Sequence, residues 1–189
     1  MQNKDDAYYI EKVLGGETEA FAVLVDRHKT LAYNISIGIV KKPEDAEEIT
    51  QDAFVKAYRS LKNFKGDSKF STWLYRIVYN SSISHLRKKQ RELPTDTESR
   101  EMMKSSGLID DDGSQNDEIL AAALNKALDA LPSGEKTMIS LYYYEDSSVE
   151  EIAKIMALSV SNVKVRLFRT RKKLHEQIRL IMNDEVPAN

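Results

Sequence analysis

The residues best suited to binding chemistry in this chain are basic and amide side chains that recur along residues 64–91. On a helix with about 3.6 residues per turn, Arg76, Asn80 and Arg87 share one face. Guanidinium and ammonium groups bind phosphates, and guanidinium and amide groups also pair with base edges. The stripe therefore indicates a nucleic-acid contact. On spacing alone, an ordinary buried helix with a solvated basic end is about as well supported as a nucleic-acid contact.

A second basic segment, residues 148–174, has the spacing of a helix-turn-helix. Ser148 and Glu151 form a capping box, Ala157 stands in the turn where Gly is more usual, and Ser159 can cap the next helix. The core stripe of that next helix is predicted to be Val163, Leu167, Leu174, Ile178 and Ile181.

The opposite side of the same helix predicts a surface that reads a DNA groove, with phosphate contacts on its flanks. Its residues are Ser161, Asn162, Lys164, Val165, Arg166, Phe168, Arg169, Arg171 and Lys172. Spacing, caps and charge agree here, so they favour DNA binding over a basic helix that is packed on a bundle for other reasons.

Charge is strongly segregated along the 189 residues, although the formal net charge is only −2. Residues 76–91 hold five bases and no acid, and residues 164–179 hold seven bases and one acid. Between them, residues 93–120 hold eight acids and two bases. Two basic ends separated by an acidic middle indicate two separate contacts with polyanions.

Several functional classes lack support in the sequence. There is no Cys, and His28, His85 and His175 lie far apart, so we interpret the histidines as surface or helix-end residues and expect neither metal nor cofactor. No P-loop, dinucleotide fingerprint or nucleophile elbow is present, and we expect no catalytic residue. Without a signal peptide or a run of about 18 apolar residues, we expect a cytoplasmic chain that does not enter a membrane.

Turn residues and hydrophobic periodicity predict the elements that must position these side chains. Helices are expected at residues 5–14, 17–40, 43–64, 72–91, 118–131 and 134–145, followed by the helix-turn-helix. Residues 93–117 are polar, acidic and without periodicity, which is typical of a flexible linker. We therefore predict an all-α fold of two small helical domains, residues 6–92 and 118–182, joined by a flexible acidic linker.

The expected helix at 43–64 carries acidic and amide side chains on the side away from its core stripe. These are Asp45, Glu48, Gln51 and Asp52. Acids near a helix N-terminus interact favourably with the helix dipole, so capping and solubility explain them on spacing alone. The sharper interpretation is a docking face for a basic protein partner.

An ordered set of motifs resembles the extracytoplasmic-function (group IV) subfamily of the sigma-70 family of RNA polymerase sigma factors. In chain order the motifs are GETEAFAVLV, DAEEITQDAF, FKGDSKFSTWLYRIVYN, SHLRKK, LDALPSGEKTMISL and SVEEIAKIMALSVSNVKVRLFRTRKKL. The resemblance covers most of the chain outside the linker. Each motif is modest alone, whereas the set in this order is highly specific.

The resemblance implies a specificity subunit of bacterial RNA polymerase with no catalytic activity of its own. Residues 6–92 would be a sigma-2 domain whose acidic helix docks on the clamp helices of the largest subunit, and residues 118–182 a sigma-4 domain on the flap of the second-largest subunit. An anti-sigma factor is a common further partner. The loop at residues 64–69 and the helix after it would recognise and open the minus-ten element, through Phe64, Lys65, Arg76, Asn80, Ser84, Arg87 and Lys88.

The second helix of the helix-turn-helix would read the minus-35 element as duplex DNA. Two departures from the family pattern concern single contacts. Ser84 stands where an acid is usual, so no contact of that acid transfers to this chain. Val165 replaces a usual Ser, which would make the reading at that position apolar, for example of a thymine methyl group.

The alternative is a stand-alone helix-turn-helix regulator whose N-terminal bundle senses a ligand or forms a dimer. The sigma hypothesis predicts that the free protein binds promoter duplex weakly and needs core polymerase. The regulator hypothesis predicts tight, sequence-specific duplex binding by the protein alone.

Overall fold

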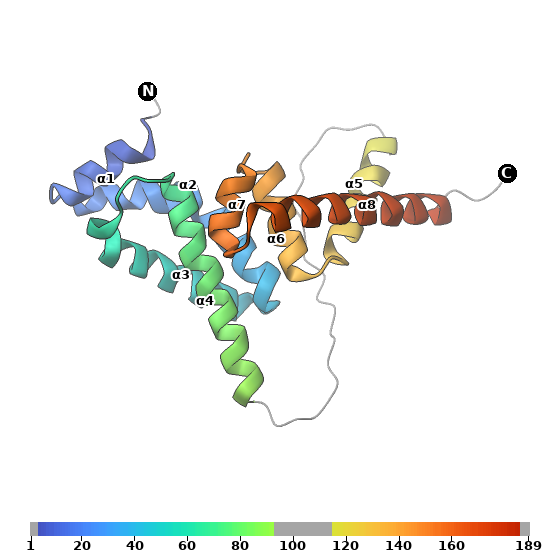
Figure 1. Ribbon diagram of the computed structural model, residues 1–189, viewed down its shortest axis with the longest axis horizontal. Coiled ribbons are helices and arrows are strands. Elements are labelled where there is room, and N and C mark those ends of the chain that lie inside the picture. Colours follow the sequence, from blue (N-terminus) through green and yellow to red (C-terminus); the bar gives the residue numbers. More distant parts are fainter. Residues whose placement is uncertain (1–3, 93–114, 186–189) are drawn as a thin grey trace.

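The chain folds entirely into helices over the residues that the structure describes. A computed structural model describes residues 4–92 and 115–185, and these ranges contain eight α-helices and two short 3-10 turns, Thr18–Ala20 and Leu61–Asn63 (Figure 1). The α-helices are α1 (Asp6–Leu14), α2 (Phe21–Val40), α3 (Pro43–Ser60), α4 (Phe70–Glu92), α5 (Gln115–Asp129), α6 (Ser133–Tyr143), α7 (Val149–Met156) and α8 (Val160–Glu185). The predicted all-α class is confirmed.

Most helix boundaries follow the turn chemistry of the sequence. The side chain of Asp5 accepts a hydrogen bond from the Tyr8 backbone N–H at 3.1 Å and caps α1, and Pro43 occupies the first turn of α3. The α5 helix begins at Gln115, three residues before its predicted start. The rest of the predicted linker, residues 93–114, lies outside the described residues.

The N-terminal bundle, α1 to α4, is organised by the packing of α2, α3 and α4 on one another. Leu24, Ala53 and Leu74, one from each of these helices, have no solvent-exposed surface. Small hydroxyl side chains fill a second layer between the helices. Ser36 on α2 accepts hydrogen bonds from Thr50 on α3 at 3.3 Å and from Ser82 on α4 at 3.2 Å. Short side chains let the three helices approach closely, and the hydrogen bonds avoid the cost of buried unpaired hydroxyls.

The C-terminal bundle, α5 to α8, contains the predicted helix-turn-helix in α7 and α8. Both halves of the capping box form, with Glu151 N–H donating to Ser148 Oγ at 3.1 Å and Ser148 N–H donating to Glu151 Oε2 at 2.7 Å. Ala157 ends α7 in the left-handed conformation, at φ 53°. Asn162 N–H donates to Ser159 Oγ at 3.2 Å, which confirms the second predicted cap.

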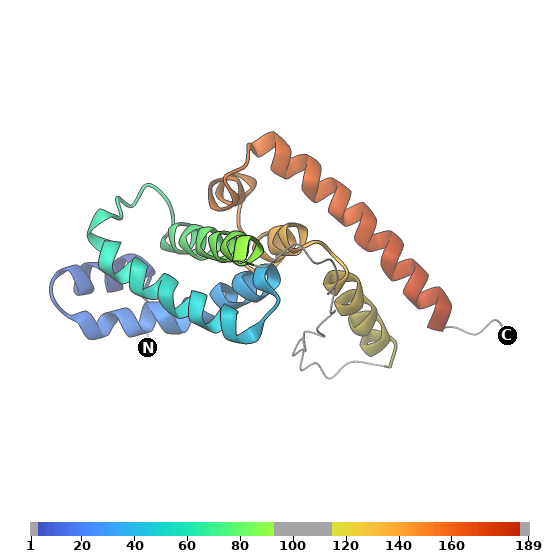
Figure 2. The ribbon, with the colours of Figure 1, turned by 90° about the horizontal axis from the view of Figure 1, so that it is seen from below.

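The two bundles touch each other along two helix pairs. The α7 helix packs on α4 and α6 packs on α2, so the buried apolar residues form one continuous core. Figures 1 and 2 show α7 beside α4, with α8 running away from the N-terminal bundle as one long helix. The α2–α6 contact is close because Gly38 is buried there, and a Cβ at this position would lie 3.7 Å from Thr137 Oγ1.

Replacing Ala157 with Gly should stabilise the protein. A left-handed backbone conformation costs a residue with a Cβ about 1–2 kcal/mol, and Gly avoids this cost. Gly also raises the conformational entropy of the unfolded chain, which offsets part of the stabilisation. We expect the free energy of unfolding to rise by about 0.5–1 kcal/mol, measured by urea unfolding followed by circular dichroism. The matched control is Ala122→Gly at an exposed position inside α5, which should lose about 1 kcal/mol. Equal destabilisation by both changes would contradict the prediction.

Candidate nucleic-acid interface

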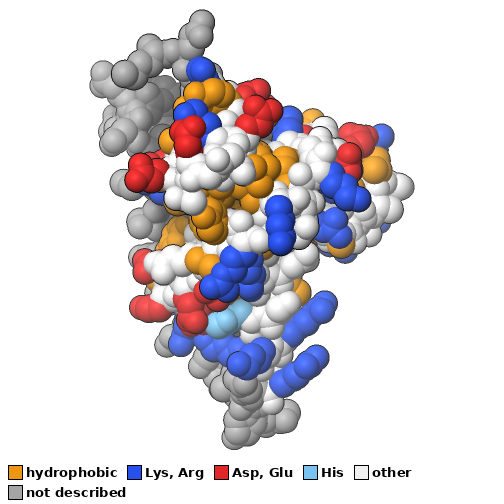
Figure 3. All heavy atoms as spheres, turned by 90° about the vertical axis from the view of Figure 1, so that its left-hand side faces the viewer, with side chains coloured by type: hydrophobic (Ala, Val, Ile, Leu, Met, Phe, Trp, Pro, Cys, Tyr) orange, Lys and Arg blue, Asp and Glu red, His pale blue; other side chains and the backbone are white. Residues whose placement is uncertain are grey.

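The predicted basic stripe lies on the exposed side of α4. Its members Arg76, Asn80, Ser84, Arg87 and Lys88 are all exposed, whereas the apolar side of the same helix is buried against the core. Figure 3 shows Lys and Arg side chains gathered over the lower half of that face of the molecule, where α4 ends in Figure 1, below a central apolar patch. The structure therefore presents these five side chains on a single face of the helix.

The loop before α4 is anchored by an aromatic cluster. The Phe64 ring lies 5.3 Å from the Trp73 ring and 6.0 Å from the Phe70 ring, measured between centroids, and Phe64 and Trp73 are both partly buried against the core. Lys65 is exposed beside them, and Gly66 has a φ of 75°, a conformation that favours Gly. The Phe64 ring, the Lys65 ammonium group and the turn at Gly66 therefore lie together at the start of the basic stripe.

The acidic side of α3 is open for three of its four predicted residues. Glu48, Gln51 and Asp52 are exposed, and a shallow groove between α3 and α4 is lined by Asp52 on one side and by Asn80 and Ser84 on the other. The predicted docking face and the predicted minus-ten face are therefore neighbours.

Asp45 differs from the prediction that it lies on the outer side of its helix. Its carboxylate is 2.8 Å from Lys89 Nζ and 3.3 Å from His85 Nε2, and only 22% of its side chain is exposed. The hydrogen bond from Lys89 holds the pKa of Asp45 below its usual value. Because the basic end of α4 crosses the start of α3, Asp45 ties these two helices together and does not share the open face.

All nine predicted groove-side residues of α8 are exposed, while Val163 and Leu167 are buried on its other side. Phe168 is 69% exposed, the most of any apolar side chain in this helix. Arg166 Nε donates to Asn162 Oδ1 at 2.9 Å, and the Arg171 guanidinium lies 4.8 Å from the centre of the Tyr142 ring. A large exposed aromatic ring beside Arg166, Arg169 and Arg171 is a candidate binding surface, because burial of such a ring is otherwise favourable.

Glu151 has a second contact that the sequence did not reveal. Besides capping α7, its carboxylate lies 3.2 Å from Lys69 Nζ and accepts a hydrogen bond from Thr72 Oγ1 at 3.4 Å, both at the start of α4. Burial acts to raise the pKa of this carboxyl, but the Ser148 N–H and the Lys69 ammonium outweigh it and lower the pKa. The first helix of the helix-turn-helix is therefore attached to the helix that bears the basic stripe.

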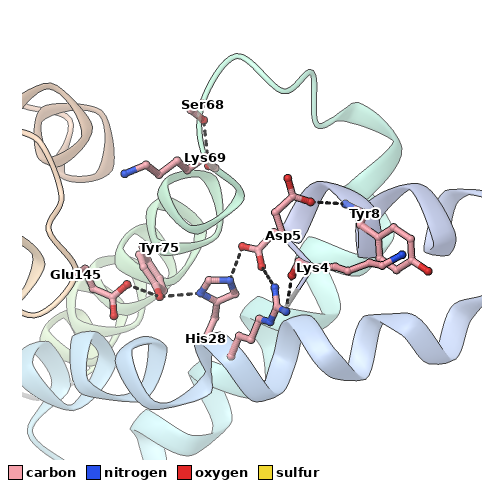
Figure 4. A network of polar contacts seen from close by, with 10 residues as sticks. Lys4, Asp5, Tyr8, His28, Ser68, Lys69, Tyr75 and Glu145 are labelled. Carbon is pink, nitrogen blue, oxygen red and sulfur yellow. Dashed lines mark hydrogen bonds and ion pairs between the residues drawn. The ribbon is translucent and has the colours of Figure 1, made fainter. Parts of the chain in front are cut away.

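A chain of polar side chains runs beside this contact, through Asp6, His28, Tyr75 and Glu145 (Figure 4). His28 Nε2 lies 2.8 Å from Asp6 Oδ2, and His28 Nδ1 lies 3.0 Å from Tyr75 Oη. The Tyr75 hydroxyl donates to Glu145 Oε2 at 3.3 Å, and burial raises the pKa of Tyr75. Figure 4 shows Lys69 extending toward the same side as Glu145.

The interpretation of His28 as a surface or helix-end residue is wrong. Its side chain is buried in the middle of α2, because Tyr75 and Asp6 satisfy both ring nitrogens. The only sequence signal for the burial of His28 was its place in the apolar stripe of α2, four residues after Leu24.

Two family models match the chain. Sigma-70 region 2 matches residues 24–92 and Sigma-70, region 4 matches residues 121–174. The first therefore covers most of the N-terminal bundle and the second covers the helix-turn-helix with the helices before it. In the part of the chain that the structure describes, no helix has the length and apolarity needed to cross a membrane.

Curated relatives match over nearly the whole chain. RNA polymerase sigma-H factor of Pseudomonas aeruginosa is 30% identical over 191 residues, covering 97% of this chain and 99% of the relative. ECF RNA polymerase sigma factor SigW of Bacillus subtilis is 33% identical over 177 residues, covering 90% and 95%. ECF RNA polymerase sigma-E factor of Escherichia coli K12 is 32% identical over 180 residues, covering 92% and 94%.

Two solved structures share the fold. The sigma factor RpoE of Bartonella quintana, solved in complex with the anti-sigma factor NepR, aligns with a TM-score of 0.63 and 23% identity over 84% of this chain and 96% of that one. CnrH in complex with the cytosolic domain of CnrY aligns with a TM-score of 0.62 and 24% identity over 96% and 99%.

Asp6→Asn should make stability less sensitive to acid. The hydrogen bonds from His28 and Arg27 lower the pKa of Asp6 in the folded chain from its usual value of 3.8. The unfolded chain therefore takes up this proton first, so the stabilisation is present above that value and is lost as the pH falls through the lowered pKa. The variant should be less stable at neutral pH and should lose less stability on acidification, measured by urea unfolding across the pH range.

The matched control for this change is Asp26→Asn. Asp26 pairs with Lys29 at the surface, where 71% of its side chain is exposed, so its removal should change little. A wild-type acid profile in Asp6→Asn would show that the contact with His28 does not contribute to stability.

Proposed function

The chain belongs to the extracytoplasmic-function group of the sigma-70 family of RNA polymerase sigma factors, and we propose that it directs bacterial core polymerase to specific promoters and starts DNA melting there. One observation carries the proposal: each matched region holds one exposed basic face, on α4 in region 2 and on α8 in region 4. The stand-alone regulator loses support because the relatives match both halves of the chain.

The two regions divide the promoter between them. Residues 6–92 form the domain that docks on polymerase and recognises the minus-ten element, residues 93–114 form the linker, and α5 to α8 form the domain that recognises the minus-35 element. The protein is a specificity subunit without catalytic activity, and it acts in the cytoplasm, where polymerase and promoter DNA are found.

The α4 face suits a strand that has left the duplex. Unstacking a base costs a few kcal/mol, which base pockets and backbone contacts must offset. Phe64 and Lys65 supply an aromatic wall and a cation at the loop, and Arg76 and Asn80 follow them on the helix. We assign the remaining contacts along the stripe to Ser84, Arg87 and Lys88.

The α8 face suits duplex DNA. Arginine pairs with guanine edges in the major groove, and apolar side chains contact thymine methyl groups. We assign such base contacts to Arg169 and Val165, which are exposed, and Phe168 lies between them in the sequence of the helix. The other exposed positions, Ser161, Asn162, Lys164, Arg166, Arg171 and Lys172, supply phosphate and groove contacts in this proposal.

Polymerase is the partner of the acidic side of α3. Glu48, Gln51 and Asp52 are exposed, and the carboxylates of Glu48 and Asp52 carry the charge expected to meet the clamp helices of the largest subunit, while Asp45 supports this face through its contact with Lys89. Region 4 binds the flap of the second-largest subunit. An anti-sigma factor is a further partner, which the complexes of RpoE with NepR and of CnrH with CnrY support.

Run-off transcription with bacterial core polymerase tests the function directly. A pool of genomic fragments is transcribed with and without the chain. Discrete transcripts that form only with the chain are the expected result, and their upstream sequences define the two promoter elements. Absence of such transcripts, together with failure of the chain to co-elute with core polymerase, would favour the hypothesis of a stand-alone regulator.

Asp52→Lys should abolish binding to core polymerase and leave the fold intact. The side chain is exposed, so the change removes no core packing, but it reverses a charge on the proposed docking face. Co-elution with core polymerase measures binding, and circular dichroism measures folding. The control is Glu11→Lys, the same kind of reversal at an exposed position on α1. If Asp52→Lys co-elutes as well as the parent, the docking face is placed wrongly.

Arg169→Ala should weaken binding of the holoenzyme at the minus-35 element by about 1–3 kcal/mol and relax its sequence preference, because a bidentate base contact is lost. Binding is measured by fluorescence anisotropy on the mapped promoter and on variants changed at single bases. Arg179→Ala is the control, an exposed arginine farther along the same helix. An equal loss on every sequence would instead identify Arg169 as a phosphate contact.

A further inference from the structure

Three consecutive tyrosines lie at the end of α6, shortly before the helix-turn-helix. Tyr143 is the last residue of the helix and is 55% exposed, and Tyr144 follows it and is 65% exposed. The rings of Tyr142 and Tyr143 meet edge to face, with their centroids 5.1 Å apart. Aromatic rings that gather at an exposed helix end indicate a contact surface, since burial of such rings is otherwise favourable.

A cation of α8 lies against the first two of these rings. The α8 helix packs across α6 (Figure 1), and the carbon of the Arg171 guanidinium is 4.8 Å from the centre of the Tyr142 ring and 5.5 Å from that of the Tyr143 ring. Both distances are within the range of about 6 Å over which a cation is attracted to the face of an aromatic ring. Two rings on α6 therefore hold one guanidinium of α8.

Arg171 lies on one flank of the α8 face. Val163 and Leu167 of the same helix are buried in the core, whereas Arg171 and Lys164 are exposed. The two cations are seven residues apart, so the helical repeat places them on the same side of α8. Cations along the flank of a helix that enters a DNA groove are in the position to bind phosphates beside that groove.

The other end of α6 treats a cation of α8 differently. Lys173 Nζ lies 3.5 Å from Glu135 Oε2, in the first turn of α6. A phosphate has to compete with this carboxylate for the ammonium group. The tyrosine rings, in contrast, orient the Arg171 guanidinium without neutralising its charge, and its planar group suits stacking better than an ammonium does. The same helix therefore neutralises one cation of α8 and orients another.

We propose that Tyr142 and Tyr143 are positioning residues for DNA recognition: their rings hold the Arg171 guanidinium at the edge of the α8 face, where it binds a phosphate of the minus-35 duplex. The proposal rests on the role of region 4 stated above, and it adds the end of α6 to the parts of the chain that determine minus-35 affinity. Immobilising a long side chain at an interface lowers affinity by about two- to tenfold. The rings reduce this loss, because they order Arg171 before the DNA arrives.

The test measures binding of the holoenzyme to a fluorescent duplex that carries a promoter mapped by run-off transcription, over a range of salt concentrations. Arg171→Ala should weaken binding by about three- to tenfold, equally on duplexes changed at single bases of the minus-35 element. It should also reduce the slope of log affinity against log salt by about one, because one phosphate contact is lost. Binding and a salt slope equal to those of the parent would overturn the proposal.

A double-mutant cycle separates positioning from ordinary packing. Tyr142→Leu should weaken binding by about threefold in the parent, because Arg171 then has to be ordered by the DNA itself. In the Arg171→Ala background the same change should alter binding by less than about 1.5-fold. If the loss persists without Arg171, it comes from disturbed packing between α6 and α8, and the positioning proposal is wrong.

Matched variants test the chemistry of the contact. Tyr142→Phe keeps the ring and should bind like the parent, and so should Tyr144→Leu at the next exposed tyrosine. Lys173→Ala should change the salt slope less than Arg171→Ala does, since Glu135 already pairs with its charge. If Tyr142→Leu binds no more weakly than Tyr144→Leu, the rings do not position Arg171.

Circular dichroism checks that each variant is folded. Should Tyr142→Leu fail to fold, Tyr143→Leu takes its place in the cycle, because Tyr143 is more than half exposed and its removal leaves the core intact. The expected loss is then about twofold, and it should again vanish in the Arg171→Ala background. A loss that remains in that background would overturn the proposal.

The proposed function and the positioning role fail in different ways. A parent that supports transcription but shows no coupling between the tyrosines and Arg171 keeps the sigma-factor role and loses the positioning role. A parent that supports no transcription with core polymerase loses the sigma-factor role, and the positioning role falls with it.

Discussion

The crossing of α4 with α2 and α3 is the contact on which the rest of the molecule depends. Small side chains at Ser36, Ala53 and Ser82 let the helices approach closely, and the buried hydroxyls satisfy one another. Once this side of α4 is buried, the helical repeat leaves the stripe from Arg76 to Lys88 facing outward. The same packing turns Asp52 outward on α3, so one core sets the direction of both candidate binding faces.

Opposite charges within the chain meet in the folded state. Asp45 contacts the basic end of α4 through Lys89, and Glu151 contacts its start through Lys69. Partly exposed ion pairs of this kind contribute little stability each, but they occupy cations that a polyanion would otherwise bind. The formal net charge of −2 therefore conceals separate acidic and basic segments, some of whose side chains pair with one another in the fold.

The positions of the two basic faces were predictable because helical periodicity is a local property. The capping box at Ser148, the left-handed turn at Ala157 and the exposed face of α8 all follow from residues within a few turns of one another, and each is confirmed. Asp45 and His28 were misplaced for the opposite reason. Their partners Lys89 and Tyr75 lie more than 40 residues away, at distances along the chain where periodicity carries no information.

The sequence by itself determined the all-α class, most helix boundaries, the helix-turn-helix and the residues on each exposed face, since these depend on local propensity, caps and a repeat of about 3.6 residues. Only the tertiary structure decided that α7 lies against α4, that Glu151 contacts Lys69, and that Gly38 meets α6. These contacts join residues from opposite sides of a long linker, and they depend on how two separately formed surfaces fit together.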